Sequence, residues 1–343
     1  MTHKKGTDTL NTRIIKIDPN NIDMTLIAEA AETVRRGGLV AMPTETVYGL
    51  GADSFNPEAV KKSFAAKGRP ADNPLISHIA EIGEVERLAR EIPARAQKLM
   101  EHFWGGPLTI ILKKRPEVPA EVSAGLDTVS IRMPSHSVAH ALIKASGTPI
   151  AAPIANLSGS PSPTLAAHCV SDLMGRVDLI IDGGSSLIGL ESTVVDLTAE
   201  VPTVLRPGAI TAEQIAEIAG DCIYGGNYAE APKCPGMKYT HYSPRAEVFA
   251  MKNMENANEM LKHKGGKTAV IDMSPNGYEA DIVYDAGTDL NSYAARLFYL
   301  LRRADEDGVD FLIARLPESE GIGAALRNRL LKAAGGRTDD IYA

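Results

Sequence analysis

Short apolar runs that alternate with helical stretches place the narrowest limits on the fold of this 343-residue chain. The runs are bounded by glycine, proline, aspartate and serine, as β-strands usually are. They form two blocks, residues 14–220 and 247–343, with an irregular segment between them. Alternating strands and helices predict an α/β (α+β) class, and the length suits about two ordinary domains.

The first block contains more strand-like runs than helices, which predicts a mixed sheet. Strands are expected over residues 38–42, 75–79, 108–112, 129–132, 150–154, 179–181 and 193–197. Helices are expected over residues 57–67, 81–90, 93–102 and 211–219. Thr211 is expected to cap the helix at 211–219, and Thr164 is expected to cap a further helix that begins directly after Thr164.

The second block alternates strictly between strands and helices, which predicts a small parallel, Rossmann-like sheet. Strands are expected over residues 247–251, 268–272, 281–284 and 311–314, and helices over 255–263, 290–304 and 324–334. The first strand is not followed by G-x-G-x-x-G, so no dinucleotide site is predicted.

Residues 221–246 are rich in glycine, proline and tyrosine and show neither helical nor strand periodicity. A linker is the simpler interpretation. Its aromatic content also suits a lid that packs over a site. The domain organisation predicted is therefore 14–220, a linker or lid at 221–246, and 247–343.

Composition excludes several classes of protein. The net charge is −7, and both halves of the chain are net negative, so bulk attraction to nucleic acid is not expected. No apolar run is long enough to span a membrane, and no signal core is apparent. Three cysteines without a C-x-x-C pair indicate neither a disulfide framework nor a zinc site, and a cytoplasmic location is expected.

Standard nucleophile, Walker A and zinc motifs are absent, and three other segments stand out. In K-G-R-P at 67–70, Gly68 and Pro70 frame two cations, Lys67 and Arg69, which suits a phosphate chain. An ordinary solvated helix end is the alternative. The polar loop at 153–164 follows a buried strand, where α/β proteins place ligands.

The third segment, P-T-E-T-V-Y-G-L-G at 43–51, is polar directly after an apolar strand and suits a small polar ligand. Arg132 lies inside a predicted strand, where an arginine is costly unless it is paired. It binds either a ligand's carboxylate or phosphate, or an internal carboxylate. His78, also in a strand, is more typical of a satisfied core histidine than of a ligand.

Taken together, the motifs resemble the YrdC-type family. They occur in family order as P-T-E-T-V-Y-G-L-G at 43–51, K-G-R-P at 67–70, N-P-L at 73–75, G-P-L-T at 106–109, S-I-R-M-P at 130–134, A-N-L-S-G-S-P-S-P-T at 155–164, D-G-G at 182–184, E-S-T-V-V-D at 191–196 and L-R-P-G at 205–208. The further domain after H-Y-S-P at 241–244 resembles the long, two-domain threonylcarbamoyl-AMP synthases.

This resemblance implies a twisted mixed sheet with helices around a concave cavity, followed by a small Rossmann-like domain. It implies a nucleotidyltransferase that converts L-threonine, bicarbonate and ATP into threonylcarbamoyl-adenylate and pyrophosphate for tRNA modification. Mg²⁺ would be held by the ATP phosphates, with no metal ligands from the protein. A monomer is expected, with tRNA or tRNA-modification proteins as further partners.

The resemblance also implies residue roles. The triphosphate would contact Lys67, Arg69 and Asn73, and the catalytic residues would be Lys67, Arg69 and Asn156. The L-threonine pocket would contain Thr46, His78, Arg132, Ala152 and Ser192. Further nucleotide contacts would come from Thr128, Ile154, Asn156, Ser162 and Arg206. His241 or Tyr242 would close over the nucleotide.

Ile154 is a departure, because the family has serine at this position. Isoleucine cannot donate a hydrogen bond to a phosphate, and its branched side chain adds bulk beside the nucleotide. An RNA- or nucleotide-binding protein with impaired catalysis is therefore an alternative to the synthase. A carbamoyl-adenylate enzyme of hydrogenase maturation is a weaker one, because the chain lacks the length and the cysteines for its additional domains.

Overall fold

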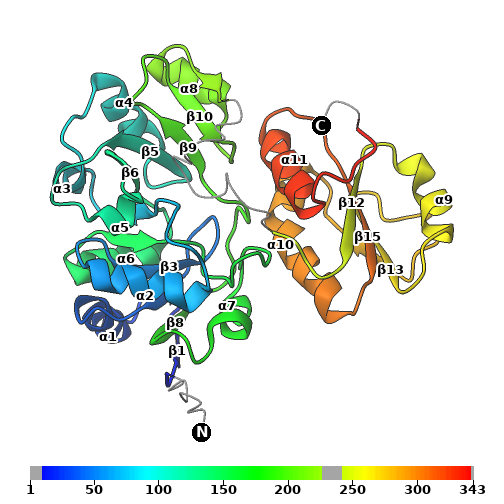
Figure 1. The fold of residues 1–343 in the computed structure, drawn as a ribbon, viewed down its shortest axis with the longest axis horizontal. Coiled ribbons are helices and arrows are strands. Elements are labelled where there is room, and N and C mark those ends of the chain that lie inside the picture. The colour runs from blue at the N-terminus through cyan, green and yellow to red at the C-terminus, as the bar shows by residue number, and fades with distance from the viewer. Residues whose placement is uncertain (1–9, 226–241, 341–343) are drawn as a thin grey trace, which may run out of the picture.

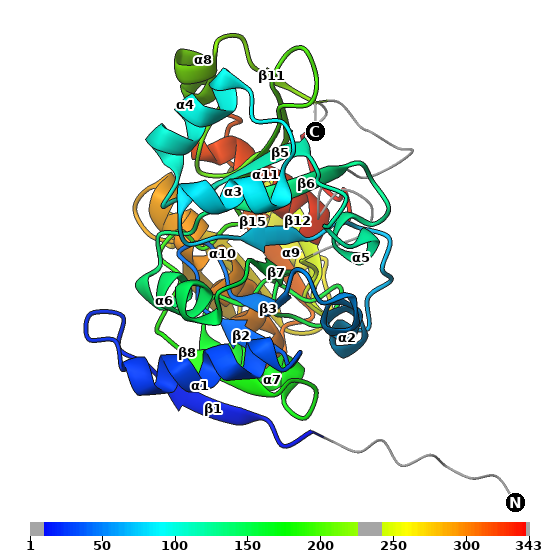
Figure 2. The same cartoon turned by 90° about the vertical axis from the view of Figure 1, so that its left-hand side faces the viewer.

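The computed structural model describes residues 10–225 and 242–340, which form two lobes (Figure 1). The first lobe is built on an eleven-stranded sheet and the second on a four-stranded sheet. Figure 2 shows the first lobe from its outer side, with helices packed around its sheet. The predicted fold class, a mixed sheet followed by a smaller α/β domain, is confirmed.

The eleven-stranded sheet is mixed and is not assembled in chain order. The order is β1-β8-β2-β3-β7-β4-β6-β5-β9-β10-β11. The strands are β1 Arg13–Lys16, β2 Val40–Met42, β3 Gly49–Asp53, β4 Ile76–His78, β5 Leu108–Lys113, β6 Thr128–Arg132, β7 Ile150–Ala152, β8 Leu179–Asp182, β9 Thr193–Asp196, β10 Thr203–Arg206 and β11 Ile223–Tyr224. β4 runs parallel to β6 and antiparallel to β7, so strands distant in sequence become neighbours.

The helices of this lobe are α1 Met24–Arg35, α2 Pro57–Lys67, α3 Val85–Leu88, α4 Ala94–Phe103, α5 Ala120–Ser123, α6 Ser137–Ser146, α7 Ala166–Leu173 and α8 Ala212–Ala219. α2 has the predicted bounds, and it ends where Gly68 takes the left-handed conformation that favours glycine. α8 begins after Thr211 as predicted, because its side chain accepts a hydrogen bond from the Gln214 backbone N–H.

One helix prediction for this lobe is wrong, and α5 and α6 were not predicted. Thr164 does not cap α7, which begins after Leu165; the Thr164 N–H instead donates to the His168 ring. Sequence reasoning also missed α1, although its signals are present. Asp23 caps the helix through two backbone N–H groups, and Ile27, Ala30, Ala31 and Val34 form a buried face with helical spacing.

The second lobe is a parallel sheet in the order β12-β15-β13-β14, as predicted. Its strands are β12 Glu247–Met251, β13 Thr268–Asp272, β14 Ile282–Asp285 and β15 Phe311–Arg315, and its helices are α9 Ala257–Lys262, α10 Leu290–Glu306 and α11 Ile322–Ala333. α10 and α11 lie on the side that faces the first lobe, and α9 lies on the far side (Figure 1).

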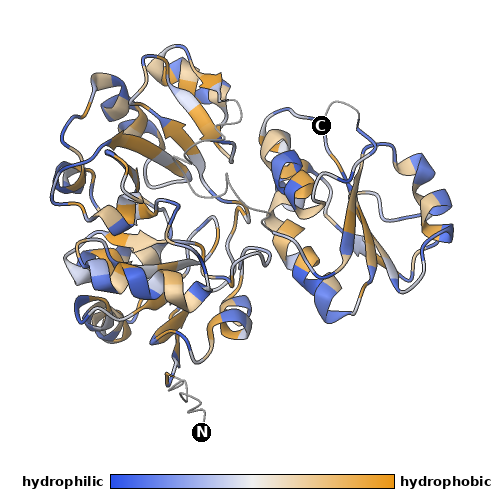
Figure 3. Ribbon diagram, viewed as in Figure 1, coloured by the Kyte–Doolittle hydropathy of each residue, from blue (hydrophilic) through white to orange (hydrophobic). Residues whose placement is uncertain are grey.

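Apolar packing joins the two lobes. Colouring by hydropathy shows apolar residues concentrated in the strands of both sheets (Figure 3). The apolar cluster under α10 and α11 also includes Val47 and Leu190 of the first lobe, and Ile154 packs against it. Within the part of the chain that the structure describes, no helix has the length and apolarity needed to cross a membrane.

Part of the predicted linker at 221–246 is ordered strand. Ile223 and Tyr224 form β11, which pairs with β10 in parallel. The predicted lid falls mostly on residues 226–241, which lie outside the described residues, and so does His241.

Candidate active site

A narrow pocket lies where several strands of the first lobe begin or end, with a volume of about 30 Å³. Seven of the predicted site residues line it: Thr46, His78, Arg132, Ala152, Ile154, Ser192 and Arg206. They come from separate stretches of the chain and meet because the sheet order makes β4, β6 and β7 neighbours. All five residues predicted to bind threonine are among them.

Arg132 ends β6 with its side chain buried in this pocket. Its Nη2 lies 2.6 Å from a Glu45 carboxylate oxygen, its Nη1 donates to Thr46 Oγ1 at 2.8 Å, and its Nε donates to the Gly106 carbonyl. The internal ion pair therefore compensates the buried arginine. Burial raises the pKa of Glu45, but Arg132, together with backbone hydrogen bonds, holds that pKa below its usual value.

His78 in β4 contributes a neutral ring to the same pocket. Its Nδ1 lies 3.1 Å from the Ile76 carbonyl and 3.3 Å from the Ile150 carbonyl. Burial, assisted by Arg132, lowers the pKa of His78 to about 3. The ring is thus both a satisfied core histidine, as its strand position suggests, and part of the pocket wall.

Ser192 and Arg206 form a second polar group in the pocket. Arg206 donates from Nε to the Ser192 carbonyl at 3.0 Å and from Nη2 to Ser192 Oγ at 3.1 Å. Ser192 Oγ also shares a hydrogen bond with Thr109 Oγ1 at 2.8 Å. A hydroxyl fixed from two sides presents a defined direction to a ligand.

Lys67 lies behind the pocket and holds the polar loop at residues 154–164. Its buried Nζ donates to the Ile154 carbonyl, to the Asn156 carbonyl at 2.6 Å and to Asn156 Oδ1 at 2.7 Å. Burial and the neighbouring Arg69 hold the pKa of Lys67 well below its usual value. A solvated helix end, the alternative interpretation, is therefore wrong for Lys67.

Asn156, Ser162 and three further predicted contacts do not line the pocket. The Arg69 guanidinium lies 6.0 Å from the centre of the Phe64 ring. Asn73 is fully buried, and neither atom of its amide group has a hydrogen-bond partner among the described residues. Thr128 begins β6, at the opposite end of that strand from Arg132.

Two carboxylates within the recognised motifs had no predicted role. Glu45 pairs with Arg132, and Glu191 accepts a 2.5 Å hydrogen bond from Ser162 Oγ. Both side chains are buried. Their places in P-T-E-T and E-S-T were visible in the sequence, but their partners are distant along the chain.

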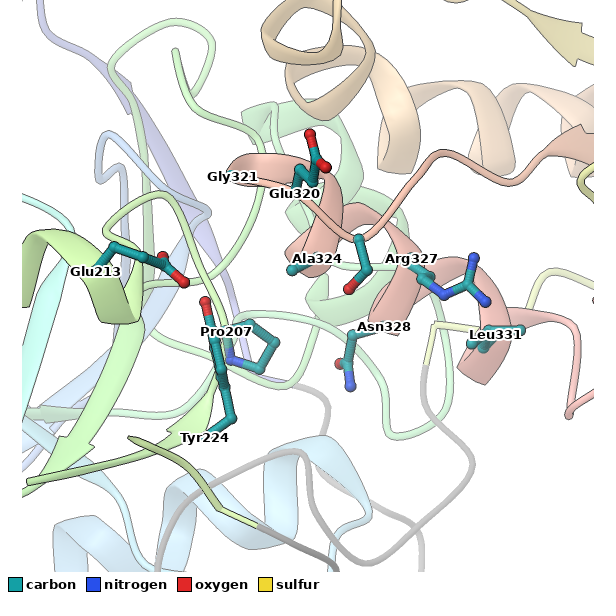
Figure 4. Close-up of a pocket in the computed structure, with 10 residues that line it drawn as sticks. Pro207, Glu213, Tyr224, Glu320, Gly321, Ala324, Arg327, Asn328 and Leu331 are labelled. Carbon is teal, nitrogen blue, oxygen red and sulfur yellow. The ribbon is translucent and has the colours of Figure 1, made fainter. Parts of the chain in front are cut away.

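A larger cavity, about 530 Å³, lies between the lobes and is distinct from this pocket (Figure 4). Tyr224 and Glu213 approach it from β11 and α8, and Asn328 and Arg327 from α11. None of the predicted site residues lines it. Size alone therefore does not locate the candidate site.

Two family models together match most of the chain. The Sua5/YciO/YrdC model, described as telomere recombination, matches residues 32–208. The model described as the C-terminal domain of threonylcarbamoyl-AMP synthase matches residues 210–335. The chain is 47% identical to threonylcarbamoyl-AMP synthase of Pyrococcus abyssi, over 90% of this chain and 94% of that one.

This chain belongs to the Sua5 family of threonylcarbamoyl-AMP synthases. The enzyme of Bacillus subtilis is 48% identical over 91% of this chain and 93% of its own. The crystal structure of P. abyssi Sua5 complexed with L-threonine superposes with a TM-score of 0.91 at 45% identity, covering 95% and 98% of the two chains. The predicted family and enzyme class are confirmed.

Two residues with predicted nucleotide contacts, Ile154 and Tyr242, pack in apolar surroundings. Ile154 lines the pocket and packs against the cluster under α10. Tyr242 belongs to that cluster, with its ring centre 5.1 Å from that of Phe298, and does not line the pocket. Among residues 10–225 and 242–340, no three His, Cys, Asp or Glu side chains are grouped as a metal site would require.

Proposed function

We propose that this Sua5 enzyme binds L-threonine in the pocket around Arg132 and ATP beside the 154–164 loop, and joins them with bicarbonate. The observation that carries the proposal is that the five residues implied for threonine converge on one pocket. The threonine complex of P. abyssi Sua5 supports it. The expected products are threonylcarbamoyl-adenylate and pyrophosphate.

On the amino-acid side, Arg132 pairs with the threonine carboxylate. A guanidinium matches a carboxylate with two parallel hydrogen bonds. The threonine carboxylate then either replaces the Glu45 carboxylate beside Arg132 or binds Arg132 together with it. Thr46 and Ser192 supply hydroxyls, His78 a neutral ring and Ala152 backbone groups for the rest of the amino acid.

On the nucleotide side, Lys67, Arg69 and Asn73 contact the triphosphate, and Asn156, Ser162 and Arg206 contact the rest of ATP. Lys67 supports this because its ammonium already has oxygen neighbours of the kind that phosphate supplies. The buried, unbonded Asn73 amide also suits a polar ligand. Thr128 and Tyr242 remain predicted contacts.

Chemistry proceeds without a covalent enzyme intermediate. The threonine amine attacks bicarbonate with loss of water, or adds to CO₂ with loss of a proton, to form a carbamate. A carbamate oxygen then attacks the α-phosphorus of ATP, and the bond to the leaving pyrophosphate breaks. The protein aligns the reactants and stabilises charge on the phosphates with Lys67 and Arg69. Mg²⁺, when bound to ATP, neutralises phosphate charge.

Pyrophosphate release from ATP, measured with and without L-threonine and bicarbonate, tests the proposal. We expect release to need both co-substrates and to yield an adenylate detectable by mass. Ile154, which lines the pocket, motivates the second candidate, a nucleotide-binding protein with impaired catalysis. ATP binding without release, unchanged when serine is restored at 154, would favour it.

A further inference from the structure

The 154–164 loop contacts the C-terminal lobe through a buried arginine of α10. Arg302 pairs with both carboxylate oxygens of Asp172, at 3.1 Å and 2.8 Å, and donates to the Pro161 carbonyl from Nε and Nη2. Asp172 also accepts the backbone N–H of Leu157. Arg302 therefore fixes two points of the loop, one directly and one through Asp172.

A second buried arginine reaches the end of the same loop from α11. Arg329 is fully buried, and its Nε donates to Glu191 Oε2 at 2.8 Å. The other oxygen of Glu191 accepts the Ser162 hydroxyl. Arg329 Nη1 also donates to the Pro207 carbonyl at 2.7 Å, directly after Arg206. The arginine thus connects to both Ser162 and Arg206, two predicted nucleotide contacts.

The need to hold the lobes together does not explain why two buried arginines lie between them. Apolar contacts already join the lobes, through Val47, Leu190 and Ile154. Gly189 also approaches α10 so closely that an added Cβ would lie 2.5 Å from Ala295 Cα. Buried charged pairs are costly compared with apolar packing of similar size. Their hydrogen bonds instead converge on one loop, which indicates that they orient it.

We propose that Arg302 and Arg329 are positioning residues, through which the C-terminal lobe holds the nucleotide-binding loop in its reactive geometry. Neither arginine lines the pocket, so each acts through the loop, Asp172 or Glu191. The proposal rests on the proposed function of that loop. It gives the C-terminal lobe a part in the known reaction without a ligand of its own.

The first test replaces Arg302 with methionine in the full chain, alone and together with Asp172→Asn. The single variant leaves Asp172 buried without its cation, whereas the double variant removes that charge and keeps an oxygen for the Leu157 N–H. We expect kcat/KM for ATP to fall about 10- to 100-fold in both. KM for threonine should change less than about threefold, because His78, Arg132 and Ala152 of its pocket lie on strands.

The matched control is Arg303→Met. Arg303 is the next residue of α10, but it pairs with Glu306 and Asp307 in its own helix. We expect it to leave kcat/KM unchanged. If thermal stability and ATP turnover both return in the Arg302→Met/Asp172→Asn variant, Arg302 only neutralises Asp172 and the proposal is wrong.

Arg329→Lys tests the second arginine while keeping its charge. A lysine ammonium cannot reproduce the planar, directed contacts with Glu191 and Pro207. We expect KM for ATP to rise about 5- to 10-fold, with Arg327→Lys on the same helix as the control. Arg327 contacts Pro317 and Asp340 within its own lobe. Unchanged ATP kinetics in Arg329→Lys would overturn this half of the proposal.

ATP binding, measured without turnover, separates the two proposals. Weaker ATP binding in Arg302→Met and Arg329→Lys than in their controls supports positioning even in a chain that releases no pyrophosphate. If the wild type is active and depends on Lys67, but the arginine variants bind and use ATP normally, only the positioning proposal fails. If neither the wild type nor the Ile154→Ser variant shows co-substrate-dependent release, the proposed function fails.

Discussion

The two sides of the candidate site are held in different ways. On the proposed threonine side, sheet register sets the neighbours of Arg132, which lies opposite His78 in β4 and Thr109 in β5. On the proposed nucleotide side, Asn156 and Ser162 lie on an irregular loop, which Lys67 and Arg302 contact directly and Arg329 contacts through Glu191. Strand-borne groups are positioned by many shared backbone bonds, whereas the loop depends on a few individual contacts.

Arg132→Met should have the largest effect, and it should fall on the strand side. Glu45 would remain buried without its cation, which costs about 3–5 kcal/mol of folding stability. Threonine binding should be lost, while ATP binding is retained. Urea unfolding and calorimetric titration with each ligand measure the two effects.

A double variant separates folding from ligand binding at this position. Glu45→Gln combined with Arg132→Met removes both charges, so most of the stability should return while threonine binding stays lost. Threonine binding by either variant at wild-type affinity would contradict the role given to Arg132.

Lys67→Met should have the next largest effect, on the loop side. It removes the donor to the carbonyl and side-chain oxygens of Asn156, and we expect kcat/KM for ATP to fall at least about 100-fold. Threonine affinity should stay within about twofold. Lys61→Met is the control, because Lys61 lies on α2 but pairs with Glu58 and Glu121 on the surface. Equal ATP kinetics in the two variants would refute the role of Lys67.

The sequence predicts the strand side of the candidate site better than the contacts that hold the loop side. Apolar periodicity located most strands and helices, and the motifs located the pocket residues, because both depend on local signals. Sequence reasoning saw Arg132 as a residue that needs a partner but could not choose Glu45, since pairing depends on how the loop after β2 meets β6. Arg302 and Arg329 gave no signal, because they read as ordinary positions of amphipathic helices until the lobes are docked.

Ile154→Ser should raise activity and lower stability, each by less than the changes expected for Arg132 and Lys67. The partly buried isoleucine leaves its contact with the α10 cluster, at a cost of about 1–2 kcal/mol. A hydroxyl beside the nucleotide should raise kcat/KM for ATP several-fold, as pyrophosphate release would show. Ile154→Val keeps the apolar contact and should raise nothing. A fall in ATP turnover in the serine variant would mean that isoleucine is the better residue here.

The smallest effect concerns pH. Burial lowers the pKa of His168 to about 4, assisted by Arg302, and that of His78 to about 3. The unfolded chain therefore binds protons that the folded chain does not, so stability falls as pH drops from 6.5 towards these values. Between pH 7 and 5 we expect a loss of about 1–2 kcal/mol for each histidine.

His168→Asn and His78→Asn divide this pH effect between the loop side and the strand side. Asparagine offers an oxygen to the Thr164 N–H in place of the His168 ring nitrogen. Each variant should flatten the decline in melting temperature between pH 7 and 5 by a similar amount. A decline as steep as that of the wild type in either variant would show that its histidine is protonated in the folded state.

The sheet order also sets a sequence of events during synthesis. β8 lies between β1 and β2, so the first two strands made have no direct partner in each other. β2 can pair with the nearby β3, but among the described strands β1 pairs only with β8, about 166 positions further along the chain, and such distant pairings slow folding. Arg329 emerges later still, in the last helix. A nascent chain therefore exposes the unpaired edge of β1 until about half of the chain has been made. If Arg329 positions the nucleotide-binding loop as proposed, that loop is complete only after the chain has left the ribosome.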